Sequence, residues 1–151
     1  MSIPIAISGT DLIGQARTGT GKTLAFGVSA LQRIVLPGDE GWTQSGSRLP
    51  QALVMCPTRE LALQVSRDID TAARVRGARV LTVYGGVGYD SQIDALKRGV
   101  DVVVGTPGRL LDLVGRRDLN LTSCSIVVLD EADEMLDLGF LPDVEKLLGH
   151  C

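Results

Sequence analysis

The sequence predicts an α/β domain in which a parallel β-sheet is flanked by helices. Short β-rich runs recur between stretches whose apolar residues have helical spacing, and several runs are almost continuous Val, Ile and Leu. Such runs are typical of strands covered on both faces, and the alternation of strand and helix is typical of parallel sheets. The 151 residues are enough for one domain that buries about two-thirds of its unfolded surface.

Five strands are expected, and each is bounded by a helical stretch or a loop. They cover residues 11–16 (DLIGQA), 51–56 (QALVMC), 79–85 (RVLTVYG), 101–105 (DVVVG) and 125–130 (SIVVLD). Apolar spacing predicts helices over residues 24–35 and within residues 61–73, 89–96 and 110–114, and the Gly- and Pro-rich residues 37–50 predict a surface loop. Ligands of such sheets bind beyond the carboxyl ends of the strands, so the strand ends are the places to look for function.

Composition excludes several classes of protein. The net charge of −3 is not the broad positive footprint of bulk nucleic-acid binding, so any RNA or DNA is bound at a local site. Two Tyr, two Phe and one Trp are too few for a base-stacking platform. The three cysteines form no C-x-x-C pair, and His150 is the only histidine, which argues against a disulfide framework, a zinc site and His-based triads.

The sequence shows no targeting or membrane signal. The N-terminus lacks a basic n-region, and no uncharged apolar run is long enough to span a bilayer. Unpaired cysteines suit a reducing compartment. We therefore expect a cytoplasmic protein with no membrane partner.

The segment ARTGTGKT follows the first expected strand and opens the first expected helix. It matches G-x-x-x-x-G-K-[ST], with Ala16 in place of the first glycine. Gly19 and Gly21 allow backbone N–H groups to surround phosphates, and Lys22 at a helix N-terminus calls for a bound anion because its charge opposes the helix dipole. The Thr23 hydroxyl suits Mg²⁺. A glycine-rich turn with an exposed lysine is the alternative.

The predicted phosphate-binding loop includes both glycines and the residues around them. Its members are Ala16, Thr18, Gly19, Thr20, Gly21, Lys22 and Thr23.

The second and fourth expected strands end in PTRELA and TPGR. Thr58 and Thr106 are good helix N-caps, and Pro107 suits the first helical position. Arg59 and Arg109, however, each place a positive charge in a first turn, where the helix dipole disfavours it. Two such arginines at equivalent junctions suggest one shared anion, most simply a nucleic-acid backbone. Solvated arginines remain the alternative.

Gly85 and Gly86 end the third expected strand. A glycine pair either makes a tight turn or lets another backbone approach closely. The sequence leaves both possibilities open.

Four acidic residues follow the fifth expected strand within the stretch DEADE. The helix dipole accounts for Asp133 and Glu134 in a first turn. It accounts less well for Asp130, which continues an apolar strand. Beside a phosphate-binding loop in the same sheet, Asp130 has the position of a Mg²⁺ ligand, and Glu131 can orient a water toward the γ-phosphate.

ARTGTGKT, PTRELA, GG, TPGR and DEAD occur in the order and approximate spacing found in the DEAD-box ATP-dependent RNA helicases. Over nearly its whole length the sequence strongly resembles the first RecA-like domain of that family, a P-loop NTPase domain. The resemblance implies ATP hydrolysis coupled to RNA binding and local duplex unwinding, with ATP and Mg²⁺ as cofactors. It also implies that the RNA partner is held by its sugar–phosphate backbone with little sequence preference.

The resemblance assigns a role to each matched position. Lys22 contacts the β- and γ-phosphates, Thr23 and Asp130 support Mg²⁺, and Glu131 acts on the attacking water, so Lys22, Asp130 and Glu131 form the expected catalytic set. Asp133 is expected to couple this site to the family's SAT motif. RNA is expected along Pro57, Thr58, Arg59, Gly85, Gly86, Thr106, Pro107, Gly108 and Arg109.

Parts of the family pattern are not found in the 151 residues. They are the Q motif that reads adenine, the SAT motif, and the second RecA-like domain with its arginine finger, which would act in cis. We therefore expect residues 1–151 to be part of an N-terminal RecA-like helicase ATP-binding domain. By itself this part is expected to bind nucleotide weakly, to hydrolyse ATP near the background rate and not to unwind RNA.

Two other readings of the sequence stay open. One is a different P-loop enzyme, although Leu-Thr-Ser follows Asn120 where a GTPase has N-K-x-D, and the transporter signature L-S-G-G-Q is missing. The other is a non-catalytic binding module, against which Lys22, Thr23, Asp130 and Glu131 argue.

Overall fold

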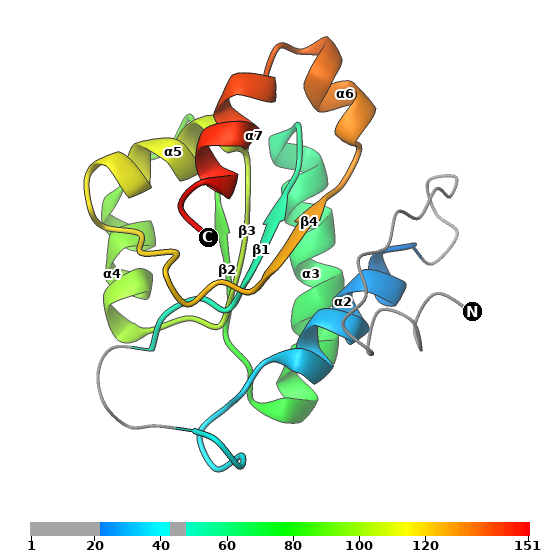
Figure 1. Ribbon diagram of the computed structural model, residues 1–151, viewed down its shortest axis with the longest axis vertical. Helices are drawn as coiled ribbons and strands as arrows, with labels where there is room; N and C mark the ends of the chain where they lie inside the picture. Colours follow the sequence, from blue (N-terminus) through cyan, green and yellow to red (C-terminus); the bar gives the residue numbers. More distant parts are fainter. Residues whose placement is uncertain (1–21, 43–47) are drawn as a thin grey trace.

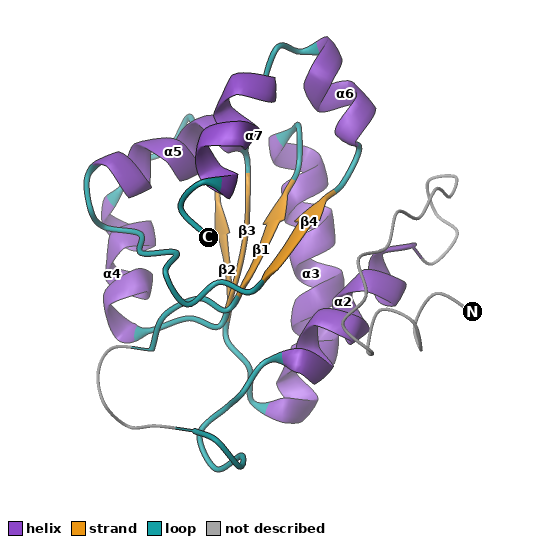
Figure 2. Cartoon of the chain, viewed as in Figure 1, coloured by secondary structure: helices purple, strands orange, loops and turns teal. Residues whose placement is uncertain are grey.

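The computed structural model describes residues 22–42 and 48–151, and in these residues a parallel sheet is flanked by helices (Figures 1 and 2). The strands are β1 (Ala52–Met55), β2 (Val80–Val83), β3 (Val102–Gly105) and β4 (Ile126–Leu129). Their order across the sheet is β2-β3-β1-β4, and each neighbouring pair is parallel. The predicted fold class is confirmed, whereas the first expected strand, residues 11–16, lies outside the described residues.

The helices agree with the predicted helical stretches and with the helix expected to begin at the DEADE acids, and they add one more. They are α2 (Lys22–Arg33), α3 (Arg59–Arg76), α4 (Asp90–Arg98), α5 (Pro107–Gly115), α6 (Ala132–Asp137) and α7 (Leu141–Leu148). The sequence did not predict α7. Its apolar pattern, with Val144 and Leu147 buried, spans only two turns, too short for periodicity to separate it from a loop.

The side chains of the strands alternate between two hydrophobic layers. In β1, Ala52 and Val54 pack in one layer with α2 and α3, while Leu53 and Met55 pack in the other with α5 and α7. Figure 2 shows these helix groups on opposite sides of the strands. All residues of β1 and β3 are buried, which confirms the prediction that these strands are covered on both faces.

The prediction of full burial is wrong for β4. Val127 and Val128 are partly exposed, and Leu129 is 40% exposed. The reason is topological, because β4 is an edge strand of the described sheet.

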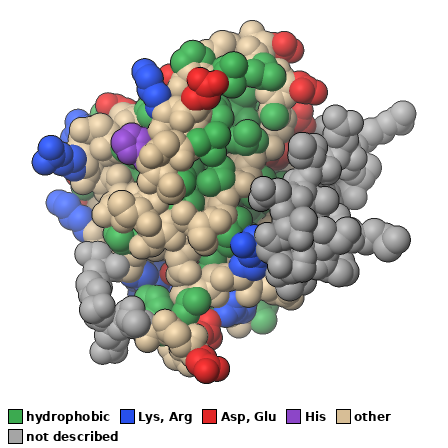
Figure 3. Space-filling model, viewed as in Figure 1, with side chains coloured by type: hydrophobic (Ala, Val, Ile, Leu, Met, Phe, Trp, Pro, Cys, Tyr) green, Lys and Arg blue, Asp and Glu red, His purple; other side chains and the backbone are tan. Residues whose placement is uncertain are grey.

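An apolar surface continues from β4 over α6 and α7. Its large side chains, Leu129, Leu136, Leu138, Leu141 and Leu148, are each between 40% and 52% exposed. Figure 3 shows hydrophobic side chains gathered over α7 and β4. Exposed apolar side chains gathered in this way are typical of a face that contacts other protein.

Asp101 joins the predicted loop to the amino ends of the strands. Its fully buried carboxylate accepts hydrogen bonds from Arg48 Nε at 2.8 Å and Arg48 Nη2 at 2.6 Å. It also accepts one from the backbone N–H of Arg79 at 2.7 Å. The Arg48 ion pair therefore fastens the end of the loop to the starts of β2 and β3.

Candidate functional site

The parallel sheet brings the predicted strand-end residues to one edge. Along that edge lie the glycine pair after β2, then residues 106–109 after β3, residues 57–59 after β1, and finally the two acids after β4. Neighbouring strands are about 4.8 Å apart. Motifs far apart in the sequence therefore lie along one edge, with the predicted RNA residues after three adjacent strands and the predicted catalytic acids beside them.

Asp130 continues the sheet and is buried at its end. The backbone N–H of Asp130 donates to Met55 O at 3.0 Å, and the residue is only 3% exposed. A carboxylate is rarely buried unless it is paired or coordinates a metal. Mg²⁺ is commonly bound by one or two carboxylates together with substrate phosphates, so the position of Asp130 fits the predicted metal ligand.

Glu131 adopts a left-handed backbone conformation, with φ 56° and ψ 48°. For a residue with a side chain this conformation costs about 1–2 kcal/mol. Strain of this kind is concentrated at functional sites, where the surrounding structure maintains it. The turn at Glu131 separates β4 from α6 and places the predicted water-orienting residue at the edge of the sheet.

Asp133 and Glu134 lie exposed in the first turn of α6. This position confirms the favourable placement of both acids relative to the helix dipole. A coupling role for Asp133 stays a prediction.

Thr58 caps α3, as its sequence context predicted. Its backbone is extended, and its Oγ1 accepts a hydrogen bond from the Leu61 N–H at 3.2 Å. The next residue, Arg59, is exposed, and its guanidinium carbon lies 4.6 Å from the centroid of the Tyr84 ring. Stacking on a ring face leaves the N–H groups in the guanidinium plane available to an anion. Pro57 is buried.

Thr106 and Pro107 begin α5. Thr106 has the extended backbone of an N-cap but makes no capping hydrogen bond with its side chain, and Pro107 occupies the first turn as predicted. The Thr106 N–H donates to Val83 O at 3.1 Å, which ties the end of β3 to the end of β2. Gly108 is exposed, and a Cβ added there would have no neighbour within 4 Å.

Arg109 differs from Arg59 because it is buried, with 9% exposure. Its Nη1 donates to Gln92 Oε1 at 3.0 Å, and its Nη2 donates to Val87 O at 2.8 Å. Its guanidinium carbon lies 4.1 Å from the centroid of the Tyr89 ring. The alternative of a solvated arginine is therefore wrong for Arg109, and contact with an anion stays a prediction.

Residues 84–89, here named the glycine loop, connect β2 to α4. Gly86 has φ 82°, a conformation that favours glycine and fits the tight-turn interpretation. Gly85 and Gly86 are exposed, and a Cβ added to either would have no neighbour within 4 Å. Their outer side is open to a second backbone.

Sequence reasoning missed three residues that organise this region, namely Tyr84, Tyr89 and Gln92. The centroid of the Tyr89 ring lies 4.1 Å from the guanidinium carbon of Arg109 and 4.4 Å from that of Arg116, and the Tyr89 hydroxyl donates to Asp112. That hydrogen bond, more than desolvation, raises the pKa of Tyr89, and the two arginines oppose the rise. The available signal was a tyrosine at each end of the glycine loop.

The described residues include only the end of the predicted phosphate-binding loop. α2 begins at Lys22, which confirms that a helix starts where the motif predicts one. Ala16, Thr18, Gly19, Thr20 and Gly21 lie outside the described residues, as do the side chains of Lys22 and Thr23.

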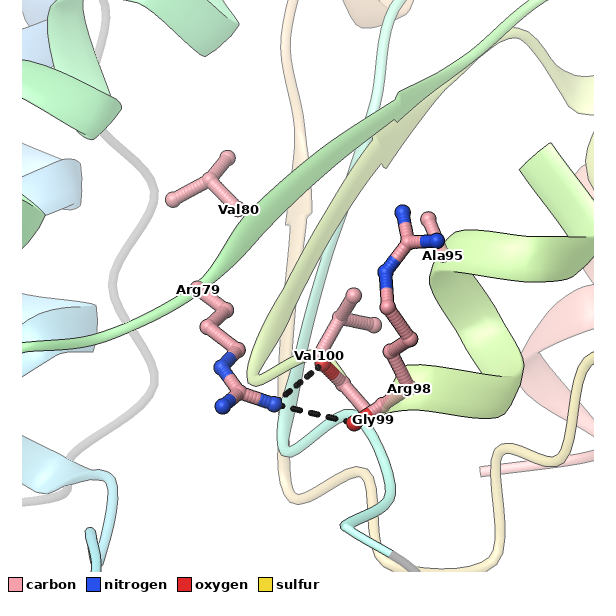
Figure 4. Close-up of a pocket in the computed structure, with 6 residues that line it drawn as sticks. All are labelled: Arg79, Val80, Ala95, Arg98, Gly99 and Val100. Carbon is pink, nitrogen blue, oxygen red and sulfur yellow. Dashed lines mark hydrogen bonds between the residues drawn. The ribbon is translucent and has the colours of Figure 1, made fainter. Parts of the chain in front are cut away.

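A separate hollow of about 570 Å³ lies at the opposite end of the sheet, lined by Arg79, Val80, Ala95, Arg98, Gly99 and Val100 (Figure 4). In it Arg79 Nη1 donates to the backbone oxygens of Arg98 at 2.9 Å and Gly99 at 3.4 Å. Arg79 therefore joins the start of β2 to the end of α4, far from the strand-end site.

The described ranges 22–42 and 48–151 contain no group of three or more His, Cys, Asp or Glu residues placed to hold a metal ion. No helix in them is long and apolar enough to cross a membrane.

Solved structures show the same arrangement of strands and helices. A hypothetical ATP-dependent RNA helicase from Sulfolobus tokodaii is 38% identical and superposes with a TM-score of 0.83, covering 99% of this chain and 40% of that one. A DEAD box protein from Methanococcus jannaschii is also 38% identical, with a TM-score of 0.85 and coverage of 99% and 39%. The fold and the strand-end site thus define a RecA-like domain.

The sequence profile of the DEAD/DEAH box helicases matches residues 1–151, and the chain belongs to this family. The DEAD-box ATP-dependent RNA helicase CshA of Streptococcus pneumoniae is 48% identical over 149 residues, which are 99% of this chain and 27% of that protein. The ATP-dependent RNA helicase RhlB of Haemophilus influenzae is 44% identical over 151 residues, which are 100% of this chain and 36% of RhlB. The chain thus spans about a third of these relatives or less.

Proposed function

We propose that the full protein that contains this chain is an ATP-dependent RNA helicase, which couples ATP hydrolysis to RNA binding and local duplex unwinding. The main support is the order of the motifs along one sheet edge, where the acids after β4 are followed by the residues after β1, then β3, then β2. The names of the relatives, both ATP-dependent RNA helicases, support it. Residues 1–151 then form part of its N-terminal RecA-like ATP-binding domain.

The ATP site is proposed to join the start of α2 to the end of β4. Ala16, Thr18, Gly19, Thr20 and Gly21 surround the phosphates with backbone N–H groups, and Lys22 neutralises the β- and γ-phosphates. Glu131 orients the attacking water. The strained backbone of Glu131 supports this role, because such strain persists where a side chain must be held in one place.

Thr23 and Asp130 would hold Mg²⁺ in this site. When bound, Mg²⁺ supplies positive charge that stabilises the phosphate oxygens during transfer. The burial of Asp130 at the end of β4 supports its assignment as a metal ligand.

The RNA site is proposed to extend across the ends of β1, β3 and β2. Its residues are Pro57, Thr58, Arg59, Gly85, Gly86, Thr106, Pro107, Gly108 and, as a buried residue that supports the site from beneath, Arg109. Two helix N-termini and exposed glycines on this edge support contact with the sugar–phosphate backbone, and such contact reads little sequence.

Regions of the full protein outside this chain are proposed to complete the enzyme. The exposed leucines of β4, α6 and α7 would be covered there, a second RecA-like domain would supply an arginine finger, and Asp133 would couple the ATP site to the SAT motif. An arginine finger raises hydrolysis by about 10³ to 10⁵. The 151 residues alone are therefore expected to bind nucleotide weakly, to hydrolyse ATP near background and not to unwind RNA. We place the protein in the cytoplasm.

ATP hydrolysis by the full protein, measured with and without single-stranded RNA and Mg²⁺, tests the proposal. RNA should stimulate the rate, and Mg²⁺ removal should abolish it. Lys22→Ala should lose ATP binding, and Glu131→Gln should bind ATP without hydrolysing it. Glu134→Gln is the matched control, because Glu134 is an exposed acid of the same turn, and it should keep the normal rate. Normal hydrolysis by Glu131→Gln, or RNA binding without any ATPase activity, would contradict the proposal.

A further inference from the structure

Gln92 and Arg109 form a buried polar pair beneath the glycine loop. Gln92 is 4% exposed and Arg109 is 9% exposed. Arg109 donates from Nη1 to Gln92 Oε1 and from Nη2 to the backbone oxygen of Val87. Gln92 Nε2 donates to the backbone oxygen of Tyr84 at 3.3 Å. The pair therefore holds the glycine loop at two points, one on each side of its glycine pair.

The groups that contact the Arg109 side chain are suited to holding the glycine loop in one conformation. The hydrogen-bond partners described for its guanidinium are an amide oxygen and a backbone carbonyl, and the Tyr89 ring lies against the same group at 4.1 Å. A guanidinium has planar N–H groups that point in fixed directions, and it stacks on aromatic faces. The side chain thus joins the first turn of α5 to the glycine loop and to the start of α4.

Arg59 supplies the contrast at the equivalent junction of the neighbouring motif. Its side chain is exposed and lies over Tyr84, so it can reach an anion directly. Arg109 has two N–H groups engaged inside the protein, while the glycines above it are exposed. The two arginines occupy equivalent positions in the sequence, but Arg109 is buried and Arg59 is exposed.

We propose that Gln92 and Arg109 are positioning residues for RNA: they hold the glycine loop so that its exposed backbone binds a phosphate group, and Arg109 acts through the loop without touching the phosphate. Backbone N–H groups of such turns bind anions when the turn is held in shape. The proposal rests on the RNA-binding function proposed above.

The affinity of the full protein for a single-stranded RNA, measured by fluorescence anisotropy at several salt concentrations, tests this. Gln92→Ala and Arg109→Lys should each weaken RNA binding about tenfold. Gln92→Ala removes the hydrogen bonds of Gln92 to Arg109 and to Tyr84 O, and Arg109→Lys removes the guanidinium hydrogen bonds to Gln92 and to Val87 O. The double variant should be no weaker than either single one, since both changes release the same loop. The slope of log affinity against log salt should stay unchanged in Gln92→Ala.

Three further variants serve as controls. Gln92→Glu keeps the acceptor for Arg109 but loses the donor to Tyr84 O, so its affinity should lie between those of the unaltered protein and Gln92→Ala. Gln64→Ala and Arg98→Lys change exposed residues on α3 and α4 and should bind as the unaltered protein does. Thermal melts establish that each variant is folded, and hydrogen exchange of residues 84–89 without RNA should be faster in Gln92→Ala.

Direct phosphate contact by Arg109 gives a different pattern. Arg109→Lys would then bind nearly normally, because lysine keeps the charge, Arg109→Met would reduce the salt slope by about 0.7, and Gln92→Ala would have no effect. That pattern would overturn this proposal and leave the proposed function standing. If the unaltered protein bound no RNA at all, both would fail.

Discussion

The guanidinium carbon of Arg59 lies 4.6 Å from the centroid of the Tyr84 ring. Arg59 opens α3 directly after β1, and Tyr84 follows β2. Because β3 lies between these strands in the sheet, the stacked pair bridges the end of β3. Tyr84 therefore sets the position of Arg59, the more exposed of the two arginines on the proposed RNA edge.

Tyr84→Ala should weaken RNA binding by the full protein about two- to tenfold. Cation–π contacts of this kind contribute roughly 0.5–1 kcal/mol when exposed and about 2 when desolvated, and without the ring Arg59 samples other rotamers. Tyr84→Phe keeps the ring and should bind normally. RNA titrations of both variants check this, and equal weakening in Phe and Ala would show that the hydroxyl matters instead of the stack.

Asp101→Ala should lower the free energy of unfolding of this chain by about 3–5 kcal/mol. The substitution removes a fully buried carboxylate and leaves Arg48, whose side chain is 14% exposed, without its ion-pair partner. The matched control is Asp70→Ala, because Asp70 pairs with Arg74 on the surface, and it should cost at most about 0.5 kcal/mol. Urea unfolding monitored by circular dichroism measures both, and equal losses would contradict the burial of Asp101.

Gly105→Ala should destabilise the chain by roughly 1–3 kcal/mol through overpacking. A Cβ at this position would lie 2.5 Å from Val83 Cγ2 and 2.7 Å from Val83 O, so β2 and β3 would have to separate. Gly115→Ala, where a Cβ would have no neighbour within 4 Å, should leave stability unchanged or raise it by up to about 1 kcal/mol. Thermal melts of the two variants measure these changes in stability, and a Gly105→Ala variant as stable as the unaltered chain would contradict the close packing of β2 against β3.

Iodoacetamide should label Cys151 and spare Cys124 in the folded chain. Cys151 is exposed, whereas Cys124 is 7% exposed and burial raises the pKa of its thiol to about 12. Alkylation requires the thiolate, so raising the pH toward about 9 should accelerate labelling of Cys151 and leave Cys124 protonated and protected. Mass spectrometry with a urea-unfolded control measures this, and equal labelling of both thiols in the folded chain would be the contrary result.

The sheet was predictable because each of its strands corresponds to a local run of apolar residues in the sequence. The apolar runs that became β1 to β4 were each found, and their parallel pairing followed from the helices between them. The exposure of Leu129 was not predictable, because it depends on the edge position of β4, which only the strand order reveals. α7 was missed because two turns carry too little periodicity.

The candidate site was predictable as a set of motifs but not as an arrangement. Strand ends mark Asp130, Glu131 and Arg59 in the sequence itself. The burial of Arg109 and the roles of Tyr89 and Gln92 depend on contacts between β2, α4 and α5, and no local pattern encodes them. The left-handed backbone of Glu131 likewise has no signal in a residue type that rarely adopts it.

We propose that one sheet edge couples an ATP site to an RNA site, and RNA affinity measured with different nucleotides tests this coupling. In the full protein with Glu131→Gln, which should hold ATP without hydrolysing it, RNA should bind at least about tenfold more tightly with ATP and Mg²⁺ than with ADP, within the usual range of coupling between sites. An RNA affinity that is the same with ATP, with ADP and without nucleotide, while RNA and nucleotide both bind, would contradict this coupling.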